Sequence, residues 1–394
     1  MKVIFFHHGH TRGGAAISLL FLLRQLKICK INCDLVDTLC SDEVRNLYKA
    51  NCRNVISRRI RYYPHSSISW LNLGKIKGIL SNIKWLLLYP VGCINVFCCL
   101  FNGGYDIVHF NSATLISYGW IPRMMGIKFI CHIREPFAAG EFGIRRILLR
   151  WFLRLFSSHC IAICEDNSED TKLPLERVSV IYNPVDFGQF DSSLLTKNTS
   201  QGLLNIPSGA FVTLFAGGSN AVVKGVSDYI RAMEIVAKSV PELVCLMPSF
   251  SEEKLDCEEA LQCLNRLGDK VIRSSFASDI EKWISACDIV YALHKTPHFS
   301  RTIMEAGAMK RVVIATDIPG ITEVVDGDYN GLLCPVGDIN SVVNATLSLY
   351  NDPVLVVKLG EGGYEQASRL FRAESHGEAV KHVYHRVLGE FERR

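Results

Sequence analysis

The sequence predicts an α/β protein made of two doubly wound parallel-sheet domains in tandem. The chain has 394 residues, which is long for a single core. Hydrophobic residues make up 48% of it and charged residues 21%, a composition that suits packed cores. Short apolar runs alternate with helical patterns throughout, and this alternation is typical of parallel strands covered by helices on both faces.

Each expected strand of the first domain is a short apolar run. Helices are expected at 15–27 and around Trp85 and Trp151, where apolar positions recur at helical spacing. The strands are, in order, 2–6 (KVIFF), 32–38 (NCDLVDT), 106–110 (DIVHF), 128–133 (KFICHI), 160–164 (CIAIC) and 178–183 (VSVIYN).

The pattern pauses and then restarts. Residues 188–206 are rich in Asn, Ser and Gly, and we interpret them as a linker between domains 1–187 and 207–365. The helical, polar tail at 366–394 is expected to pack back on the first domain. The second domain has a helix at 227–239 and strands at 211–218, 243–248, 271–275, 288–294, 312–316 and 331–334.

Charge is distributed unevenly. Residues 1–190 hold 23 Lys and Arg against 13 Asp and Glu, a net of +10, whereas residues 191–394 hold 20 against 26, a net of −6. A basic first half favours an anionic partner, such as a membrane surface or a phosphorylated acceptor. No nucleic-acid motif is visible, so nucleic acid ranks last.

One segment bears on the membrane. Residues 85–101 are nearly all apolar but short for a spanning helix. A buried or membrane-dipping helix beside the sheet is favoured over a true span. Basic residues at 58–61 flank it, and the stretch 143–156 alternates Arg with apolar residues, which suits either an interfacial helix or a core helix with a basic face.

The cellular location follows from two features. The chain starts as a strand rather than as a secretory signal, and its 15 scattered cysteines suit a reducing compartment. We therefore expect a cytoplasmic protein with peripheral contact to the inner face of the cytoplasmic membrane.

Four loops are candidates for ligand binding, because ligands of open parallel sheets bind at the carboxyl ends of strands. They are 7–14 (HHGHTRGG), 132–137 (HIREPF), 216–225 (AGGSNAVVKG) and 298–320 (HFSRTIMEAGAMKRVVIATDIPG).

Four motifs in these regions, in this order, carry a resemblance. They are GGA at 13–15, IYNPVD at 181–186, the Gly-to-Lys-Gly loop within 216–233, and the 298–320 block. Together they resemble the family-four retaining glycosyltransferases, or glycosyl transferases group 1. The resemblance implies the GT-B fold, two Rossmann-like domains facing a central cleft. The chain departs from the family at two places, where Pro297 stands for the first of two glutamates and Gly218 for an arginine.

The resemblance implies a nucleotide-diphosphate sugar as donor. Glycine amides would approach its phosphates, Lys224 would neutralise the leaving diphosphate, and Glu305 would accept hydrogen bonds from the ribose. Arg301 would add a second cation, and Thr302 would cap the helix that carries Glu305. The implied donor-binding residues are Gly13, Gly14, Gly217, Lys224, Phe299, Ser300, Arg301, Thr302, Glu305 and Gly320.

The first domain supplies the remaining implied roles. His132 would contact the donor sugar near the reacting carbon, so the catalytic residues would be His132, Lys224 and Glu305. His10, Arg134 and Glu135 are acceptor-side candidates, although the last two suit an ion pair equally well. Residues 294, 295 and 298 are candidates for the role of the missing glutamate.

The implied activity is transfer of a hexose-type sugar, from UDP by preference, to a glycan acceptor in cell-surface polysaccharide assembly. The basic first half favours a lipid-linked acceptor. Retention would follow from same-face attack, with the departing phosphate taking the acceptor's proton. We expect no metal and no cofactor, since the D-x-D at 326–328 lies among turn residues.

Other interpretations stay open. Thr302-x-x-Glu305 also fits a helix capping box, which would give Glu305 a purely structural role. A dehydrogenase is disfavoured because GHTRGGAA is not G-x-G-x-x-G. A nucleotide-sugar epimerase of the same fold would need paired catalytic carboxylates. The departures at 297 and 218 also allow a catalytically inactive, nucleotide-binding partner of a glycan assembly complex.

Overall fold

A computed structural model describes most of the chain. It covers residues 1–8, 13–38, 42–61, 76–101, 103–137, 139, 143–216, 222–255, 257–275, 277 and 279–390. The chain divides into two compact units. Unit 1 comprises Met1–Pro184 and Ala373–Arg394, and unit 2 comprises Val185–Arg372.

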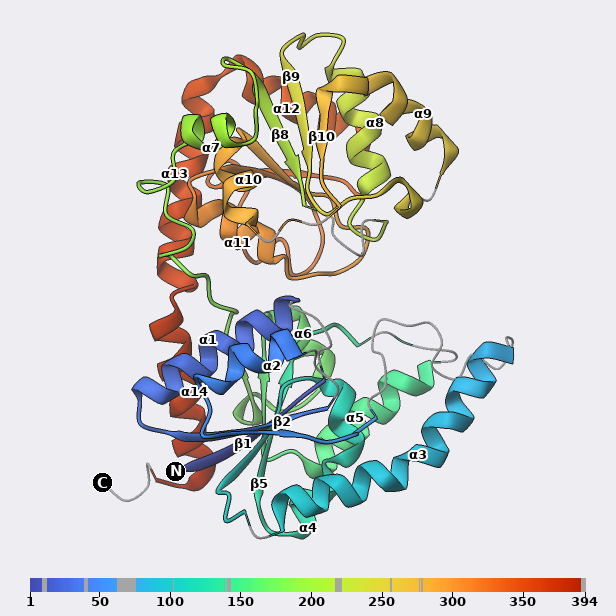
Figure 1. Ribbon diagram of the computed structural model, residues 1–394, viewed down its shortest axis with the longest axis vertical. Coiled ribbons are helices and arrows are strands. Elements are labelled where there is room, and N and C mark those ends of the chain that lie inside the picture. Colours follow the sequence, from blue (N-terminus) through green and yellow to red (C-terminus); the bar gives the residue numbers. More distant parts are fainter. Residues whose placement is uncertain are drawn as a thin grey trace. The chain divides into compact units, whose positions relative to one another are not determined.

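Unit 1 contains a seven-stranded parallel sheet in the order β3-β2-β1-β4-β5-β6-β7 (Figure 1). Parallel strands bury both faces, so β1, β4 and β5 are almost continuous apolar runs. The strands are β1 (Lys2–His7), β2 (Asn32–Asp37), β3 (Asn54–Ser57), β4 (Ile107–Phe110), β5 (Lys128–Ile133), β6 (His159–Ala162) and β7 (Val178–Val180).

Helices cover both faces of this sheet. Helix α1 (Gly14–Ile28) packs one face with Leu19, Leu22 and Leu23, which are fully buried. Helix α14 (Ala373–Leu388) lies beside α1, and its Val380 and Tyr384 join the same core. The other elements of unit 1 are α2 (Asp42–Lys49), α3 (Ile76–Leu100), the 3-10 helix η1 (Ala113–Tyr118), α4 (Trp120–Met124), α5 (Ile144–Phe156), α6 (Glu165–Thr171) and the 3-10 helix η3 (Leu175–Arg177).

Unit 2 repeats the architecture with a six-stranded parallel sheet, in the order β10-β9-β8-β11-β12-β13. Its strands are β8 (Phe211–Phe215), β9 (Leu243–Met247), β10 (Val271–Arg273), β11 (Ile289–Ala292), β12 (Val312–Thr316) and β13 (Gly331–Cys334). Its helices are α7 (Lys197–Leu203), α8 (Val226–Val236), α9 (Glu258–Leu267), α10 (Ile280–Ala286), α11 (Arg301–Ala308), α12 (Ile339–Asn351) and α13 (Pro353–Leu370), with 3-10 turns η5 (Glu252–Lys254) and η6 (Gly268–Lys270).

The unit boundaries differ from those expected. Residues 188–206 are not a free linker, because they contain α7, which packs against α10 within unit 2. The Gln201 amide donates to the Ala286 carbonyl at 3.1 Å, and Ser285 Oγ donates to the Leu195 carbonyl at 2.6 Å. At the other end, α13 stays in unit 2 to Leu370, and the part that joins unit 1 begins at Ala373.

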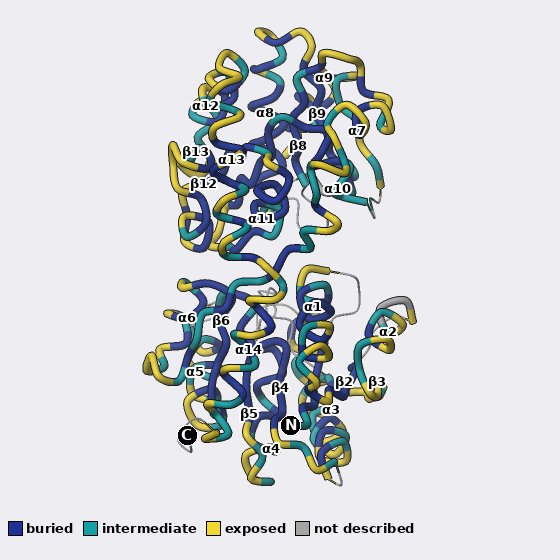
Figure 2. Tube along the Cα trace, turned by 90° about the vertical axis from the view of Figure 1, so that its left-hand side faces the viewer, coloured by how far each residue is buried: buried dark blue, intermediate teal, exposed yellow. Residues whose placement is uncertain are grey.

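Helix α3 is longer and more exposed than the sequence indicated. The apolar segment expected at 85–101 is the second part of a 25-residue helix that contains Pro90. Within it, Gly78–Leu100 has the length and composition to cross a membrane, yet only 17% of its most apolar window is buried in the protein. Of the two expected alternatives, a buried or a membrane-dipping helix, the buried one is therefore wrong, because much of α3 is exposed or half-buried in Figure 2.

Candidate functional site

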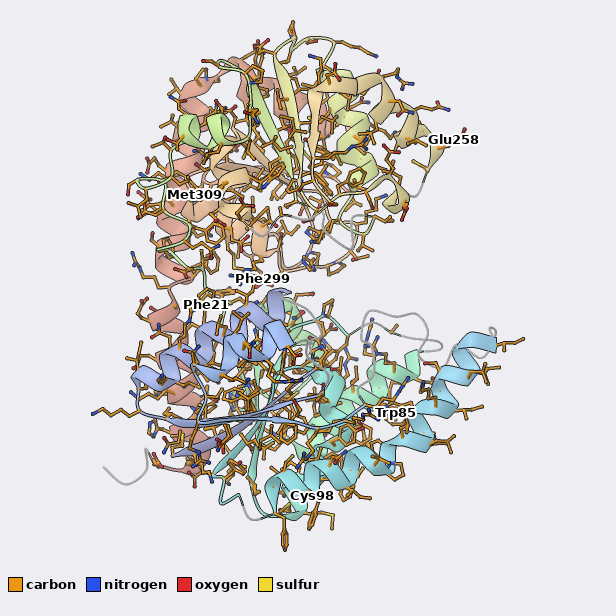
Figure 3. All side chains as sticks on the ribbon, in the orientation of Figure 1. Phe21, Trp85, Cys98, Glu258, Phe299 and Met309 are labelled. Carbon is orange, nitrogen blue, oxygen red and sulfur yellow. The ribbon has the colours of Figure 1, made fainter. Side chains whose placement is uncertain are left out.

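The candidate donor site of unit 2 lies where the strand order reverses. Strands β8 and β11 are parallel neighbours, but the next strand after β8 lies on one side of the pair and the next after β11 on the other. Such switch points bind ligands at the carboxyl ends of the strands. Lys224 follows β8, and His294 follows β11. Figure 3 labels Phe299, from the segment after β11, at the end of unit 2 toward which β8 and β9 run.

Gly225 brings the Lys224 loop against the end of β11. Its φ is +81°, and a Cβ there would lie 2.1 Å from the carbonyl oxygen of Leu293. The amide of Lys295 also donates to the Val223 carbonyl at 2.9 Å. Both contacts fix Lys224 beside His294. The sequence included Gly225 in the predicted Gly-to-Lys-Gly loop but gave it no role of its own, although a glycine directly after the lysine indicates such a close approach.

This cluster is cationic but its histidines are neutral. The His294 and His298 rings stack with centroids 4.2 Å apart. Burial, with the nearby charge of Lys224, lowers the pKa of His298 to about 4 and holds the pKa of His294 well below its ordinary value. Burial also lowers the pKa of Lys224, which the charge of Glu305 opposes. Within the described part of the chain, the Lys224 ammonium has no hydrogen bond, so it can contact an anion.

Glu305 lies on α11, with its side chain 9% exposed and Arg301 Nε 2.7 Å from its Oε1. The capping box is wrong, because α11 begins at Arg301 and its N-cap residue is Ser300. Thr302 is thus inside the helix and does not cap it. Burial raises the pKa of Glu305, while Arg301 and then Lys224 lower it. Lys224, Arg301 and Glu305 therefore share one electrostatic environment, as the sequence predicted.

The residues that precede and follow α11 fix its start. Ser300 is buried, and Phe299 packs edge-on against Phe371 with ring centroids 6.3 Å apart. Gly320 has a φ of +82°, and a Cβ there would lie 2.7 Å from the His298 carbonyl oxygen. Gly320 therefore supports the loop at His298 rather than merely exposing an amide.

Gly307 allows α11 to pack closely on α13. A Cβ at Gly307 would lie 2.7 Å from the carbonyl oxygen of Gly363 in α13. Gly307 is therefore needed for this approach of the two helices.

Of the predicted residues in the two glycine-containing loops, the structure describes Gly13 and Gly14. Gly13 is the N-cap residue of α1 and Gly14 is its first residue, and both are exposed. The Ala16 amide donates to the Gly13 carbonyl at 3.0 Å, so of the first helical amides only those of Gly14 and Ala15 can be offered to a ligand at this end of α1. Gly217 and His10 lie outside the described residues.

Unit 1 gathers polar side chains at its own switch point, between β1 and β4. Asn111, directly after β4, lies at the centre. Its Nδ2 is 3.0 Å from His7 Nδ1, at the end of β1, and its Oδ1 accepts from Arg134 Nε at 2.9 Å. Arg134 Nη1 donates to Asn183 Oδ1 at 2.6 Å. The second predicted motif, at 181–186, thereby meets the loop after β5.

Three buried, neutral histidines, His109, His132 and His376, lie next to this cluster. Tyr384 Oη lies 2.7 Å from His109 Nδ1, and His109 Nε2 lies 3.3 Å from His132 Nδ1. The His376 ring stacks on that of His132 with centroids 6.5 Å apart. Burial and the charge of Arg134 hold the pKa of His132 and of His109 well below the ordinary value, and lower that of His376 to about 3.

His132 thus presents a neutral ring with one nitrogen unused. Arg134 Nη2 also approaches His132 Nδ1, at 3.4 Å, and an arginine can only donate. Nδ1 is therefore the acceptor and Nε2 carries the proton. The Nε2 atom is buried and has no hydrogen-bond partner within the described residues. It is available to donate to a substrate oxygen.

Comparison with known families decides the identity. The model for glycosyl transferases group 1 matches residues 210–352, and the model for glycosyltransferase family 4 matches residues 12–189. Between them they cover both units. This chain belongs to the group 1, family 4 glycosyltransferases.

Two curated relatives illustrate the family. The UDP-Gal:alpha-D-GlcNAc-diphosphoundecaprenol alpha-1,3-galactosyltransferase of Escherichia coli is 24% identical over 275 residues, which are 66% of this glycosyltransferase and 70% of that one. The N-acetyl-alpha-D-glucosaminyl L-malate synthase of Bacillus anthracis is 27% identical over 168 residues, 42% of this chain and 43% of that one.

Solved structures confirm the GT-B fold. Anabaena Alr3699/HepE, determined in complex with UDP and glucose, has a TM-score of 0.77 and 19% identity, with 97% of this glycosyltransferase and 99% of that chain covered. Sucrose-phosphate synthase from Thermosynechococcus elongatus has a TM-score of 0.76 and 17% identity, with 99% and 100% covered. At sequence identities of 19% and 17%, the similarity to these two structures is evidence for the fold alone.

The remaining predicted residues have partners of their own. Glu135 is buried, and the Ser112 hydroxyl donates to it. Lys295, one candidate for the role of the missing glutamate, is exposed, and its Nζ lies 3.8 Å from Asp228 Oδ1. Asn111 and His109 had not been singled out, although each stands in the DIVHFN stretch at the end of β4, where ligand-binding residues are expected.

Asp326–Asp328 of this glycosyltransferase form a tight turn. Asp328 has a φ of +69°, and the Asp326 amide donates to Asn330 Oδ1 at 2.8 Å. Across the described residues, no group of three or more His, Cys, Asp and Glu side chains is arranged to hold a metal ion.

Proposed function

We propose that this glycosyltransferase moves a hexose-type sugar from a nucleotide-diphosphate sugar to a glycan acceptor, with retention of configuration. The observation that supports it best is the cluster of Lys224, Arg301 and Glu305 at the switch point of unit 2. It combines a cation without a hydrogen bond in the described structure, a second cation, and a buried carboxylate. A diphosphate needs the first two, and a ribose diol needs the third.

We propose UDP as the nucleotide. The E. coli relative is named for a UDP-Gal donor, and the Anabaena neighbour was crystallised with UDP and glucose. In this chain, Glu305 would accept hydrogen bonds from the ribose hydroxyls, displacing part of its contact with Arg301. Arg301 would then turn toward the diphosphate, where its planar guanidinium suits phosphate oxygens.

The proposed chemistry relies on positioning and charge. As the bond between the anomeric carbon and the phosphate oxygen breaks, negative charge grows on the departing diphosphate, and Lys224 stabilises it. The acceptor hydroxyl attacks the same face and passes its proton to that phosphate oxygen. His132, neutral and with Nε2 as donor, holds a sugar hydroxyl during the transfer. The proposed reaction uses no metal ion.

We propose a lipid-linked acceptor at the cytoplasmic face of the membrane, in cell-surface polysaccharide assembly. The net charge of +10 over residues 1–190 and the exposed apolar side chains of α3 support this placement. The E. coli relative acts on a diphosphoundecaprenol-linked sugar, according to its name.

A donor panel tests the proposal. The protein is incubated with UDP- and GDP-hexoses, a membrane lipid extract and excess chelator, and free nucleoside diphosphate is measured. We expect release of UDP that depends on the extract. Binding of UDP without release from any donor would favour the inactive-partner interpretation. Activity that requires added Mn²⁺ would refute the metal-free mechanism.

A further inference from the structure

Helix α3 of unit 1 is anchored along one side only. Tyr89 stacks on Tyr118 of η1 with ring centroids 5.0 Å apart, and its hydroxyl donates to the Ser117 carbonyl at 2.6 Å. Gly92 allows this approach, because a Cβ there would lie 2.4 Å from the Tyr118 hydroxyl. The helix is therefore held firmly, and it projects along one side of unit 1 (Figure 1).

The opposite side of α3 is an exposed apolar face. Leu80, Ile83, Leu87 and Ile94 recur at helical spacing and are 49% to 71% exposed. Helix α5 adds Ile147 and Trp151, at 62% and 52%. Exposed apolar surface of this extent marks an interaction site in a soluble protein.

Between these helices lies an apolar pocket. It is an open hollow rather than a closed cavity, and its space of about 470 Å³ includes the open solvent at its mouth. Its walls come from α3, η1 and α5, and Figure 3 labels Trp85, the α3 residue that lines it. The lining residues are Trp85, Ala113, Thr114, Ile116, Ser117, Glu135, Phe137, Arg145, Leu148, Leu149 and Phe152.

One part of this pocket is polar. Glu135 and Arg145 are both more than nine-tenths buried. The Ser112 hydroxyl donates to Glu135 and lies 2.9 Å from Thr114 Oγ1. Burial lowers the pKa of Arg145, while the charge of Glu135 raises it. Because Glu135 directly follows Arg134, the pocket adjoins the loop that carries the candidate acceptor residues.

The two helices that flank the pocket are basic, and their acidic partners come from other elements, such as Glu135 in the pocket and Asp170, 3.6 Å from Arg150. Helices α3 and α5 together hold six Lys and Arg and no Asp or Glu. The basic segment 58–61 lies alongside, since Asn95 Nδ2 donates to the Arg59 carbonyl at 2.9 Å and the Tyr118 hydroxyl to the Arg61 carbonyl at 2.7 Å. This arrangement suits an occupant that joins an apolar chain to an anionic head.

We infer that the pocket between α3, η1 and α5 binds the first units of the long apolar chain of the acceptor, with its anionic linkage near Arg145. The rest of the chain would continue along the exposed face of α3. A glycan alone has little apolar surface to bury against these walls. The pocket is also small, so it has room for only a short part of a hydrocarbon chain. The inference rests on the proposed function, because it assigns the lipid part of the acceptor to a specific place.

Soluble amphiphiles test it directly. Binding of geranyl diphosphate, decyl phosphate and inorganic diphosphate is measured by titration calorimetry below micellar concentrations. With the proposed donor site saturated by UDP, we expect the two amphiphiles to bind and inorganic diphosphate not to bind detectably. Dimethylallyl diphosphate should bind more weakly than geranyl diphosphate, by roughly fourfold in Kd for each methylene that enters the pocket. A preference between the geranyl and decyl probes distinguishes an isoprenoid chain from a saturated one.

A matched pair of variants locates the binding. Leu148→Trp fills the pocket from a half-buried position, whereas Ile147→Trp places the same side chain on the exposed side of α5. We expect the first to weaken geranyl diphosphate binding at least tenfold and the second to leave it unchanged. Equal binding by both variants would overturn the inference, and so would failure of the wild-type protein to bind either amphiphile.

UDP binding by the same variants separates this inference from the proposed function. Both should bind UDP as the wild type does. Loss of amphiphile binding with UDP binding intact would support the pocket. Amphiphile binding without any UDP binding would leave the pocket standing and refute the proposed donor. A dimer that Leu87→Glu dissociates, in a protein that does not bind the amphiphiles, would assign the α3 face to a second copy and refute the pocket.

Discussion

His109 Nε2 lies 3.3 Å from His132 Nδ1, and this contact links the candidate catalytic histidine to the end of the chain. Tyr384 on α14 holds the other nitrogen of His109 at 2.7 Å. If the tyrosine hydroxyl donates to Nδ1, His109 donates through Nε2 to His132 Nδ1. The proton of His132 is then fixed on Nε2, as its contact with Arg134 also requires.

Tyr384→Phe tests this relay. Loss of the Tyr384 hydroxyl removes one buried hydrogen bond. We therefore expect the free energy of unfolding to fall by about 1 kcal/mol and kcat to fall about fivefold, with KM for the donor unchanged. Tyr350→Phe is the control, because the Tyr350 hydroxyl donates to an exposed carboxylate, that of Glu242. Unaltered kcat in a folded Tyr384→Phe protein would refute a positioning role.

Lys224→Ala should cost about 10²-fold in kcat, because a cation that stabilises the leaving diphosphate contributes about 3 kcal/mol to the transition state. Stability should not fall, since the cost of burying the charged ammonium outweighs its attraction to Glu305 and the net effect lowers the pKa of Lys224. Steady-state kinetics with the best donor check the first expectation. Lys282→Ala, which breaks an ion pair with Asp279 at the start of α10 between two half-exposed side chains, is the control and should retain full activity.

Glu305→Gln distinguishes a ligand role from a structural one. Burial holds the pKa of Glu305 above its ordinary value, so the stability linked to its protonation is present at low pH and is lost as pH rises through that raised pKa. At pH 7 the glutamine variant should therefore be at least as stable as the wild type. Its kcat/KM for the donor should nevertheless fall about 10²-fold. Denaturant unfolding and kinetics test the two expectations, and a markedly destabilised variant would favour the structural role.

Gly225→Ala should destabilise unit 2 by roughly 2–4 kcal/mol, since it combines a positive φ with a Cβ 2.1 Å from the Leu293 carbonyl. Gly209→Ala is a matched control. Gly209 has nearly the same φ, +80°, but a Cβ there meets nothing within 4 Å. Its cost should be about 1 kcal/mol. Urea unfolding of both variants provides the comparison, and similar costs would show that Gly225 is required only for its φ.

The buried histidines predict acid sensitivity of unit 1. Burial and Arg134 hold the pKa values of His109, His132 and His376 below the unfolded value. A lowered pKa in a base means that the unfolded state binds more protons, so stability is full above about pH 6.5 and falls below it. We expect unfolding free energy to decline from pH 6.5 to about 3, the folded pKa of His376, and His376→Leu to reduce that decline. A flat profile over this range would show that these rings are accessible to protons when folded.

The sequence determined the class of fold and the position of most strands. Parallel strands are buried on both faces, so VVIAT at β12 and DIVHF at β4 are recognisable as apolar runs. It also placed Lys224, Arg301 and Glu305 in one site, because the carboxyl ends of neighbouring parallel strands meet at one edge of a sheet.

Only the tertiary structure decided the partners of those residues. Thr302-x-x-Glu305 has the spacing of a capping box, yet the helix starts at Arg301, and Glu305 pairs with that residue instead. Nor could the chain alone show that α3 turns its apolar face outward or that Tyr384 reaches His109, 275 residues away. Local patterns specify elements, whereas contacts between distant side chains depend on how those elements pack.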